Sequence, residues 1–186
     1  SGTGRPPAVA TSRRDRSNTL IQVGRRVVGI SFGSLAVRMS YIQNTLHFIF
    51  STQRRIPVLD TKVRGELLPY IAGIARDRNI RPIKINGVAD HLHLLLALPS
   101  TITLAQAMQA IKGGSSRWLN EKFPKSGKFT WQKKYGAFSV SHSRCAAVMD
   151  YIERQEEHHR KKTFKEEFRE FLEVHGVDYD ERYIWE

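Results

Sequence analysis

Residues 90–99 read Asp-His-Leu-His-Leu-Leu-Leu-Ala-Leu-Pro, and this apolar run with its two histidines constrains the fold most. If the run is a strand, successive side chains alternate between faces, so His91 and His93 share one face while Leu92 lies on the other. Two neutral imidazoles on one face can hold a divalent cation and leave positions for a third protein ligand, water or a phosphate oxygen. Taken alone, the motif is explained more simply by histidines with ordinary hydrogen bonds.

A second motif, Tyr151-x-x-x-Gln155, lies in a segment that is predicted to be helical. Residues four apart lie one above the other on a helix, so a hydroxyl nucleophile and an amide ligand would be presented together. Ser143 is expected to cap this helix. The apolar stripe of the helix consists of Cys145, Val148, Met149 and Ile152. Tyr151 and Gln155 fall at the edge of that stripe, near solvent, where a catalytic side chain belongs.

With these two motifs, the chain resembles the single-tyrosine HUH transposases of the IS200/IS605 type, including their REP-associated relatives. The resemblance covers Met39 to His159. The two motifs in this order are far more specific together than either is alone. The resemblance implies that His91 and His93 are metal ligands, that Gln155 is the third ligand and that Tyr151 is the nucleophile.

The resemblance also implies a mechanism and partners. A Mg²⁺ or Mn²⁺ ion would polarise the scissile phosphate of single-stranded DNA, and the tyrosine would attack it. The expected products are a 5′-phosphotyrosyl enzyme and a free 3′-hydroxyl, which can later be rejoined. Members of this family recognise hairpin DNA and many are dimers, so we expect hairpin DNA as substrate and a homodimer.

Charge and length define the expected domains of the 186-residue chain. Residues 1–38 hold seven arginines and one acid, and residues 39–186 hold 23 basic and 17 acidic residues, so each part contributes half of the net charge of +12. An excess of basic residues is typical of proteins that bind the phosphates of nucleic acids, although other proteins have it too. We expect a disordered basic extension over 1–38, the transposase domain over 39–160, and a C-terminal helix and tail over 161–186.

The amino-acid composition indicates the cellular compartment in which the protein works. The single cysteine excludes an intramolecular disulfide and fits a reducing cytoplasm. No apolar run approaches the length that spans a bilayer. The sequence therefore predicts a soluble cytoplasmic protein without a membrane partner.

The order of elements predicts the fold class. A strand over Tyr41–Thr52, a helix from Asp60 to about Asn79, a hairpin of strands, a helix from Thr103, a strand-like segment and the tyrosine helix follow one another. This order fits a ferredoxin-like βαββαβ α+β sandwich with an antiparallel sheet and an added C-terminal helix that carries the tyrosine. The histidine strand should be central in that sheet.

Several basic residues are candidates for DNA contact. Arg54 and Arg55 follow the first strand. Lys112 and Arg117 flank a Gly-Gly-Ser-Ser segment that should weaken or kink its helix, and either helix packing or approach of a DNA backbone explains the glycines. Lys133 and Lys134 stand among aromatic residues, a composition typical of sites where bases stack. The full set is Arg54, Arg55, Lys112, Arg117, Lys133 and Lys134.

Alternatives remain open at the level of residues and of function. Tyr135 is a rival nucleophile, but no ligand residue follows it at helical spacing. His158 and His159 are interpreted as a solvated helix end rather than as ligands, and His47 as a half-buried strand residue. The functional alternatives are a non-catalytic or domesticated nucleic-acid-binding protein of the same fold and an HUH nickase of replication or conjugation.

Overall fold

The computed structural model describes residues 20–23, 26–29, 41–124, 127–160 and 162–185, and the chain divides into units Ser1–Tyr41 and Ile42–Glu186. In the first unit, β1 and β2 form an antiparallel hairpin within the expected extension; the rest of that prediction lies outside the described residues. The elements are β1 Leu20–Val23, β2 Arg26–Gly29, β3 Thr45–Ser51, η1 Gln53–Arg55, α1 Thr61–Arg76, β4 Arg81–Gly87, β5 His91–Ala97, α2 Leu104–Lys122, β6 Gly136–Ser139, η3 His142–Arg144, α3 Cys145–Glu153, α4 Gln155–His158 and α5 Phe164–Val174.

The second unit contains a four-stranded antiparallel sheet with the strand order β4-β5-β3-β6. β5 is central, between β4 and β3, and its His93 lies opposite Ile49 of β3. The sequence order β3-α1-β4-β5-α2-β6 is the βαββαβ arrangement. The predicted α+β fold and the central position of the histidine strand are therefore confirmed.

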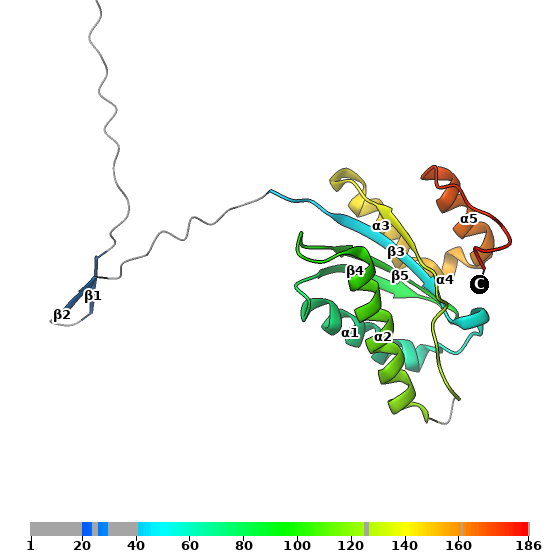
Figure 1. The fold of residues 1–186 in the computed structure, drawn as a ribbon, viewed down its shortest axis with the longest axis horizontal. Coiled ribbons are helices and arrows are strands. Elements are labelled where there is room, and N and C mark those ends of the chain that lie inside the picture. The colour runs from blue at the N-terminus through cyan, green and yellow to red at the C-terminus, as the bar shows by residue number, and fades with distance from the viewer. Residues whose placement is uncertain (1–19, 24–25, 30–40, 125–126, 161, 186) are drawn as a thin grey trace, which may run out of the picture. The chain divides into compact units, whose positions relative to one another are not determined.

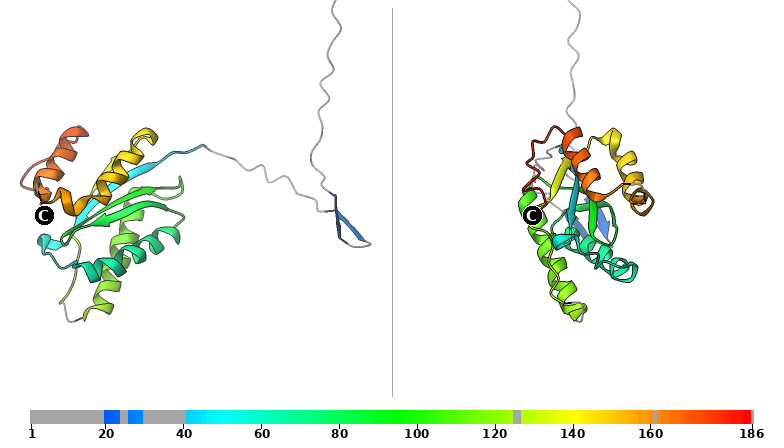
Figure 2. Two further views of the ribbon diagram at one scale, coloured as in Figure 1. Left: turned by 180° about the vertical axis from the view of Figure 1, so that it is seen from behind. Right: turned by 90° about the vertical axis from the view of Figure 1, so that its right-hand side faces the viewer.

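Helices cover both faces of the sheet. α1 and α2 pack on one face, and α3 and α5 lie on the other (Figure 1; Figure 2 shows the same division from behind). Leu92, Leu94 and Leu96 belong to the main core, with the helices α1 and α2. Leu95, on the opposite face, packs with Ile152 of α3. Because side chains alternate between the two faces along β5, His91 and His93 face α3 and α5.

The predicted helix starts are confirmed by their caps. The side chain of Asp60 accepts a hydrogen bond from the backbone N–H of Val63 at the start of α1. Thr103 and Gln106 form a capping box at the start of α2. These caps satisfy backbone donors that the first turn of a helix leaves unpaired.

The alternative of a kink in α2 at its glycine pair is wrong, because α2 runs through both glycines as one helix. The weakening of the helix stays a prediction. A Cβ added at Gly114 would lie 2.8 Å from Cδ1 of Ile74, on α1. Close packing of the two helices therefore explains Gly114. A Cβ at Gly113 would meet no neighbouring element within 4 Å in the described part of the chain.

Gly87 ends β4 beside the histidine strand, and we expect Gly87→Ala to lower the free energy of unfolding by about 1–3 kcal/mol. A Cβ there would lie 2.3 Å from the carbonyl oxygen of His91 and 2.9 Å from Cα of Leu92, which are backbone atoms that cannot rotate away. Urea titration measures the change. Gly113→Ala is the matched control and should stabilise by up to about 1 kcal/mol, because alanine favours the helix. Equal stability of the two variants would contradict this account.

The helix predicted from Ser143 through Gln155 is divided into three pieces. Ser143 lies in η3 and does not cap α3. Arg154, with φ −90° and ψ 24°, separates α3 from α4. Met149 is 37% exposed, so it is not part of a buried stripe. Tyr151 and Gln155 therefore belong to different helices, although they remain neighbours. Among the helices of the described residues, none is long and apolar enough to cross a membrane.

Candidate active site

Side chains from β5, α4 and α5 converge on one buried point. The ligand atoms of His91, His93, His159 and Glu167 all lie within 4.8 Å of one another. Oε2 of Glu167 lies 3.7 Å from Nε2 of His91, 3.6 Å from Nε2 of His93 and 3.2 Å from Nε2 of His159. His91 and His93, which sequence reasoning selected, are thus together, with two further residues beside them.

Gln155 also reaches this cluster. Its side chain is completely buried, and its Oε1 lies 3.0 Å from Nε2 of His159. Its Nε2 donates to Oε1 of Glu167 at 3.4 Å and to the carbonyl oxygen of Tyr151 at 3.4 Å. The amide is therefore oriented with its oxygen toward the histidines. The structure brings all three predicted ligands to one place.

Hydrogen bonds on the outer side of the cluster fix which histidine nitrogens face inward. Nδ1 of His91 donates to Oδ1 of Asp90 at 2.7 Å, and Nδ1 of His159 donates to the carbonyl oxygen of Lys162 at 3.0 Å. In a neutral imidazole the other nitrogen then carries a lone pair. These two Nε2 atoms lie 2.9 Å apart, and Oε1 of Gln155, also an acceptor, adjoins them. Three acceptors facing one another fit a bound cation.

His47 of β3 contacts His93 on the side away from the cluster. Its Nε2 and Nδ1 of His93 form a hydrogen bond of 3.0 Å. His47 is only 2% exposed, so the expectation of a half-buried residue is wrong. Burial, followed by the charge of His175, lowers the pKa of His47 to about 3. The neutral ring can therefore fix the orientation of His93.

Burial sets the charge of the cluster itself. It lowers the pKa of His93 well below the ordinary value, and burial with the neighbouring His91 lowers the pKa of His159 to about 4. Burial also raises the pKa of Glu167 to about 8. Nε2 of His93 and Oε2 of Glu167 have no hydrogen-bond partner among the described residues. Because buried polar atoms are normally paired, these neutral nitrogens and this carboxyl form a set that suits a divalent metal.

Tyr151 lies between the cluster and an open groove. Its ring centroid is 5.9 Å from that of His93, and its hydroxyl is buried without a hydrogen-bond partner in the described ranges. The groove has a volume of about 450 Å³ and is lined by Ala147, Asp150, Tyr151, Arg154, Glu157 and His158. Tyr151 therefore lines this groove on the side of the cluster.

Tyr135 lies elsewhere. Its ring is 6.3 Å from that of Phe48 in the main core, and the ammonium of Lys112 lies 5.7 Å from its centroid. It therefore belongs to the α2 side of the sheet, while the histidines face the other side. Of the two tyrosines considered from the sequence, only Tyr151 adjoins the cluster.

Sequence reasoning missed two members of the cluster. The prediction that His159 belongs to a solvated helix end is wrong, because its side chain is only 14% exposed and faces His91. Glu167 was not considered at all. A signal existed, because Glu167 follows Phe164 by three residues and precedes Phe171 by four. A carboxylate on the apolar face of a helix indicates a specific buried partner.

The predicted DNA-binding residues have different surroundings. Arg54 and Arg55 both have φ of 55°, a left-handed conformation that is strained for arginine. The Arg55 guanidinium lies 5.8 Å from the ring of Phe164, which adjoins His91. Arg54 thus turns outward near the site, where it is exposed.

Lys112 requires a correction. Its ammonium donates to the carbonyl oxygens of Gln132, Lys133 and Lys134 at 2.5, 2.9 and 3.2 Å, so its three donors are occupied within the protein. Desolvation lowers its pKa to about 8. Lys112 therefore joins α2 to the segment before β6 rather than facing DNA. Arg117, Lys133 and Lys134 are exposed, and the ammonium of Lys134 donates to the carbonyl oxygen of Tyr183.

We expect Glu167→Gln to weaken Mn²⁺ binding about 10- to 100-fold while the fold is retained. The amide has the shape of the protonated carboxyl that burial favours without a cation, but it cannot supply a negative charge. Calorimetric titration with Mn²⁺ measures the affinity. Glu170→Gln, an exposed change on the same helix, is the control. Unchanged affinity in Glu167→Gln would place Glu167 outside the ligand set.

Comparison with known proteins agrees with this geometry. The family model described as "Transposase IS200 like" matches residues 40–155. The ISDra2 transposase TnpA of Deinococcus radiodurans is 28% identical over 114 residues, covering 59% of this chain and 81% of that protein. The transposase for insertion sequence element IS200 of Salmonella typhimurium is 26% identical over 114 residues, covering 59% and 74%.

Two solved structures share the fold. One is a crystal structure from Deinococcus radiodurans whose description as a transposase is provisional. Its TM-score is 0.54 at 27% identity, and the match covers 63% of this chain and 95% of that chain. The other is a REP-associated tyrosine transposase bound to a REP hairpin, with a TM-score of 0.50 at 20% identity, covering 66% and 72%, which supports the fold alone. The family match spans the histidine motif, the tyrosine and the glutamine, and it confirms the resemblance. The chain belongs to the IS200-like transposase family, whose proteins act in DNA recombination.

Proposed function

We propose that this transposase cleaves and rejoins single-stranded DNA in a metal-dependent reaction in which Tyr151 is the nucleophile. The observation that carries the proposal is the buried hydroxyl of Tyr151, which has no hydrogen-bond partner among the described residues. Its ring lies 5.9 Å from that of His93, in the cluster where acceptors of His91, His93 and Gln155 converge. A tyrosine in an ordinary core position would pack its hydroxyl against a donor or expose it to water.

The residues that would hold the ion are His91, His93 and Gln155, with His159 and Glu167 in addition. A divalent ion bound there would act as a Lewis acid toward a phosphate oxygen. The nitrogen-rich set favours Mn²⁺ over Mg²⁺, because imidazole suits transition metals and oxygen ligands suit magnesium. Asp90 and His47 keep two of these imidazoles in the required orientation.

Tyr151 then performs the covalent step. Its phenolic oxygen forms a bond to the phosphorus of the scissile phosphate, and the bond from phosphorus to the 3′ oxygen of the preceding nucleotide breaks. The phenol gives up its proton and the released 3′ oxygen takes one up, so the products are a 5′-phosphotyrosine and a 3′-hydroxyl. The reverse attack by a 3′-hydroxyl rejoins the strand without an external energy source.

The proposed substrate is single-stranded or hairpin DNA, and the solved relative bound to a REP hairpin supports this choice. We propose from the family resemblance that the protein works in the cytoplasm and as a homodimer. The alternatives are a nucleic-acid-binding protein of the same fold without covalent chemistry and a nickase of replication or conjugation. The convergence of tyrosine and ligands favours an active enzyme over the first alternative.

Arg54 and Arg55 are proposed to hold the phosphates near the site, with the exposed Arg117, Lys133 and Lys134 as further contacts. Arg54→Ala with Arg55→Ala should weaken binding to hairpin DNA and reduce the slope of log affinity against log salt by about one to two. Fluorescence anisotropy at several salt concentrations measures the slope. Arg76→Ala, an exposed change on α1, should leave it unchanged. An unaltered slope in the double variant would exclude both arginines from phosphate contact.

One incubation tests the proposed function. The full chain is mixed with labelled hairpin DNA that has single-stranded arms, with and without Mn²⁺, and run on a denaturing gel. The proposal predicts a DNA–protein adduct that survives denaturation and requires the metal. Binding of DNA with no adduct under any metal condition would instead support the non-catalytic alternative.

A further inference from the structure

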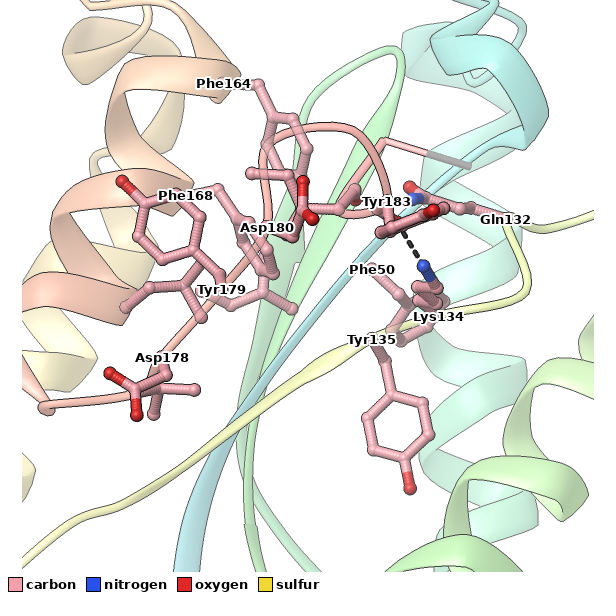
Figure 3. Close-up of a pocket in the computed structure, with 14 residues that line it drawn as sticks. Phe50, Gln132, Lys134, Tyr135, Phe164, Phe168, Asp178, Tyr179, Asp180 and Tyr183 are labelled. Atoms are coloured by element: carbon pink, nitrogen blue, oxygen red, sulfur yellow. Dashed lines mark hydrogen bonds between the residues drawn. The ribbon is translucent and has the colours of Figure 1, made fainter.

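We propose that α5 and the C-terminal segment form a binding site for unpaired nucleobases, centred on an aromatic pocket next to the metal cluster (Figure 3). The inference rests on the proposed function and specifies where the DNA strand goes beside it. Most of the residues that build this pocket lie beyond residue 155, where the family match ends. The site is therefore an addition of this chain to the matched domain.

The pocket has the size and lining of a site for a flat aromatic ligand. Its volume is about 300 Å³, at the lower end of the range for small-molecule pockets. Four aromatic side chains line it from α5 and from the C-terminal segment: Phe164, Phe168, Tyr179 and Tyr183. Phe50 and Tyr135 border it from the sheet, but their rings pack in the main core. Figure 3 shows Phe164 and Phe168 on one side and Lys134 with Gln132 on the other.

A row of rings connects the metal cluster with this pocket. The centroids of His91 and Phe164 are 4.5 Å apart, and those of Phe164 and Phe168 are 5.6 Å apart with nearly parallel planes. Trp185 follows at 6.1 Å from Phe168. Bases stack on such rings without sequence preference, because every base has a π-face. His91 and Phe164 are buried, so the accessible part of this row, on which a strand leaving the scissile phosphate would stack, is Phe168 and Trp185.

Cations accompany the row, as a phosphate backbone requires. Arg55 lies over Phe164, and the charged groups of Lys165 and Arg169 lie 5.1 and 5.7 Å from the ring of Trp185. Lys134 lies 5.6 Å from the ring of Tyr183. Rings interleaved with cations are the usual composition of single-strand binding surfaces.

Two carboxylates decide which part of a nucleotide enters. Asp178 and Asp180 both line the pocket, and Asp180 is bonded to the guanidinium of Arg182. Carboxylates repel a phosphate but accept hydrogen bonds from the N–H donors of bases, which include exocyclic amino groups and the N3–H of thymine. The base is therefore expected inside the pocket and the phosphate at its cationic rim.

The C-terminal segment is held in place by specific bonds. The ammonium of Lys134 donates to the carbonyl oxygen of Tyr183, and Nε2 of Gln132 donates to that of Ile184 at 3.1 Å (the first bond is the dashed line in Figure 3). Arg169 donates to Glu181 at 2.9 Å. A pocket formed before the ligand arrives loses less conformational entropy on binding.

The test compares two strands that share phosphates and differ in bases. The probes are a labelled single strand of about 20 deoxythymidines, longer than typical single-strand site sizes, and an abasic strand of the same length. The full chain should bind the thymidine strand more tightly. Phe168→Leu, which removes the π-face but keeps apolar volume, should lose about tenfold affinity for the thymidine strand and none for the abasic strand.

Two further variants complete the test. Tyr183→Leu, at a ring that is 51% exposed and so contributes little to folding, should reproduce the selective loss. Tyr70→Leu changes a ring on α1 that stacks on Trp118 on the other face of the sheet, and it should leave both affinities unchanged. Equal affinities of the full chain for both strands, or equal losses on both strands in Phe168→Leu and Tyr183→Leu, would overturn the pocket. A metal-dependent adduct of the same protein preparations with hairpin DNA would show that the proposed function stands when the pocket fails; absence of that adduct would show that the proposed function has failed.

Discussion

His91→Ala and His93→Ala are each expected to lower metal-dependent strand cleavage by more than about a hundredfold, because loss of an outer partner alone costs 10- to 100-fold. Each change removes an inward-facing nitrogen from the cluster, and no neighbouring side chain replaces it. Titration calorimetry with Mn²⁺ and a cleavage assay on hairpin DNA measure the two effects. His142→Ala is the control, because His142 is exposed in η3 and lies outside the cluster.

These two variants are also expected to lose stability, which differs from the sequence-based expectation that the fold is largely unaffected. Both histidines are fully buried, and His93→Ala leaves Nε2 of His47 without its partner. An orphaned buried polar atom costs about 1–3 kcal/mol. Circular dichroism at the assay temperature therefore has to show folded protein. Cleavage at the wild-type rate by both folded variants would exclude the cluster from the reaction.

Tyr151→Phe is expected to abolish the covalent adduct and leave both folding and DNA binding intact. The change keeps the ring and its contacts with His93 and His158. The hydroxyl that is removed has no hydrogen-bond partner among the described residues, so its loss should not destabilise the fold. The adduct gel and anisotropy on the same preparation separate chemistry from binding.

Tyr135→Phe is the matched control, because it makes the same change at the other tyrosine that the sequence offers. It should form the adduct at the wild-type level, since Tyr135 packs on the α2 side of the sheet. An adduct in Tyr151→Phe that is lost in Tyr135→Phe would reverse the assignment.

The periodicity of strands and helices predicted those parts of the site whose residues lie within a single strand or helix. The two-residue period of a strand placed His91 and His93 on one face, and helical spacing paired Tyr151 with Gln155. The pairing holds although Arg154 divides the helix, because the side chain of Gln155 still donates to the carbonyl oxygen of Tyr151. The central position of the histidine strand was likewise predicted from the succession of elements, and it is confirmed.

The missed residues depend on how distant segments dock. Glu167 reaches the cluster only because α5 folds back over the histidine face of the sheet, and its place among apolar residues indicates burial without showing where. His159 follows α4, and it reaches the cluster because that turn docks beside His91. Lys112 was misjudged for the same reason, since the carbonyls that hold its ammonium come from residues 132–134 across the fold. Tertiary contacts of this kind become visible only in three dimensions.

The most direct test of the central claim is to map the nucleotide on the conjugated peptide. The wild-type adduct formed with hairpin DNA and Mn²⁺ is treated with nuclease and trypsin and analysed by tandem mass spectrometry. Trypsin separates the two candidates, because Tyr151 lies in the peptide 145–154 and Tyr135 in the peptide 135–144. The account predicts a nucleotide phosphate on Tyr151 in peptide 145–154. A nucleotide on peptide 135–144, or on a tyrosine of the C-terminal segment, would contradict it.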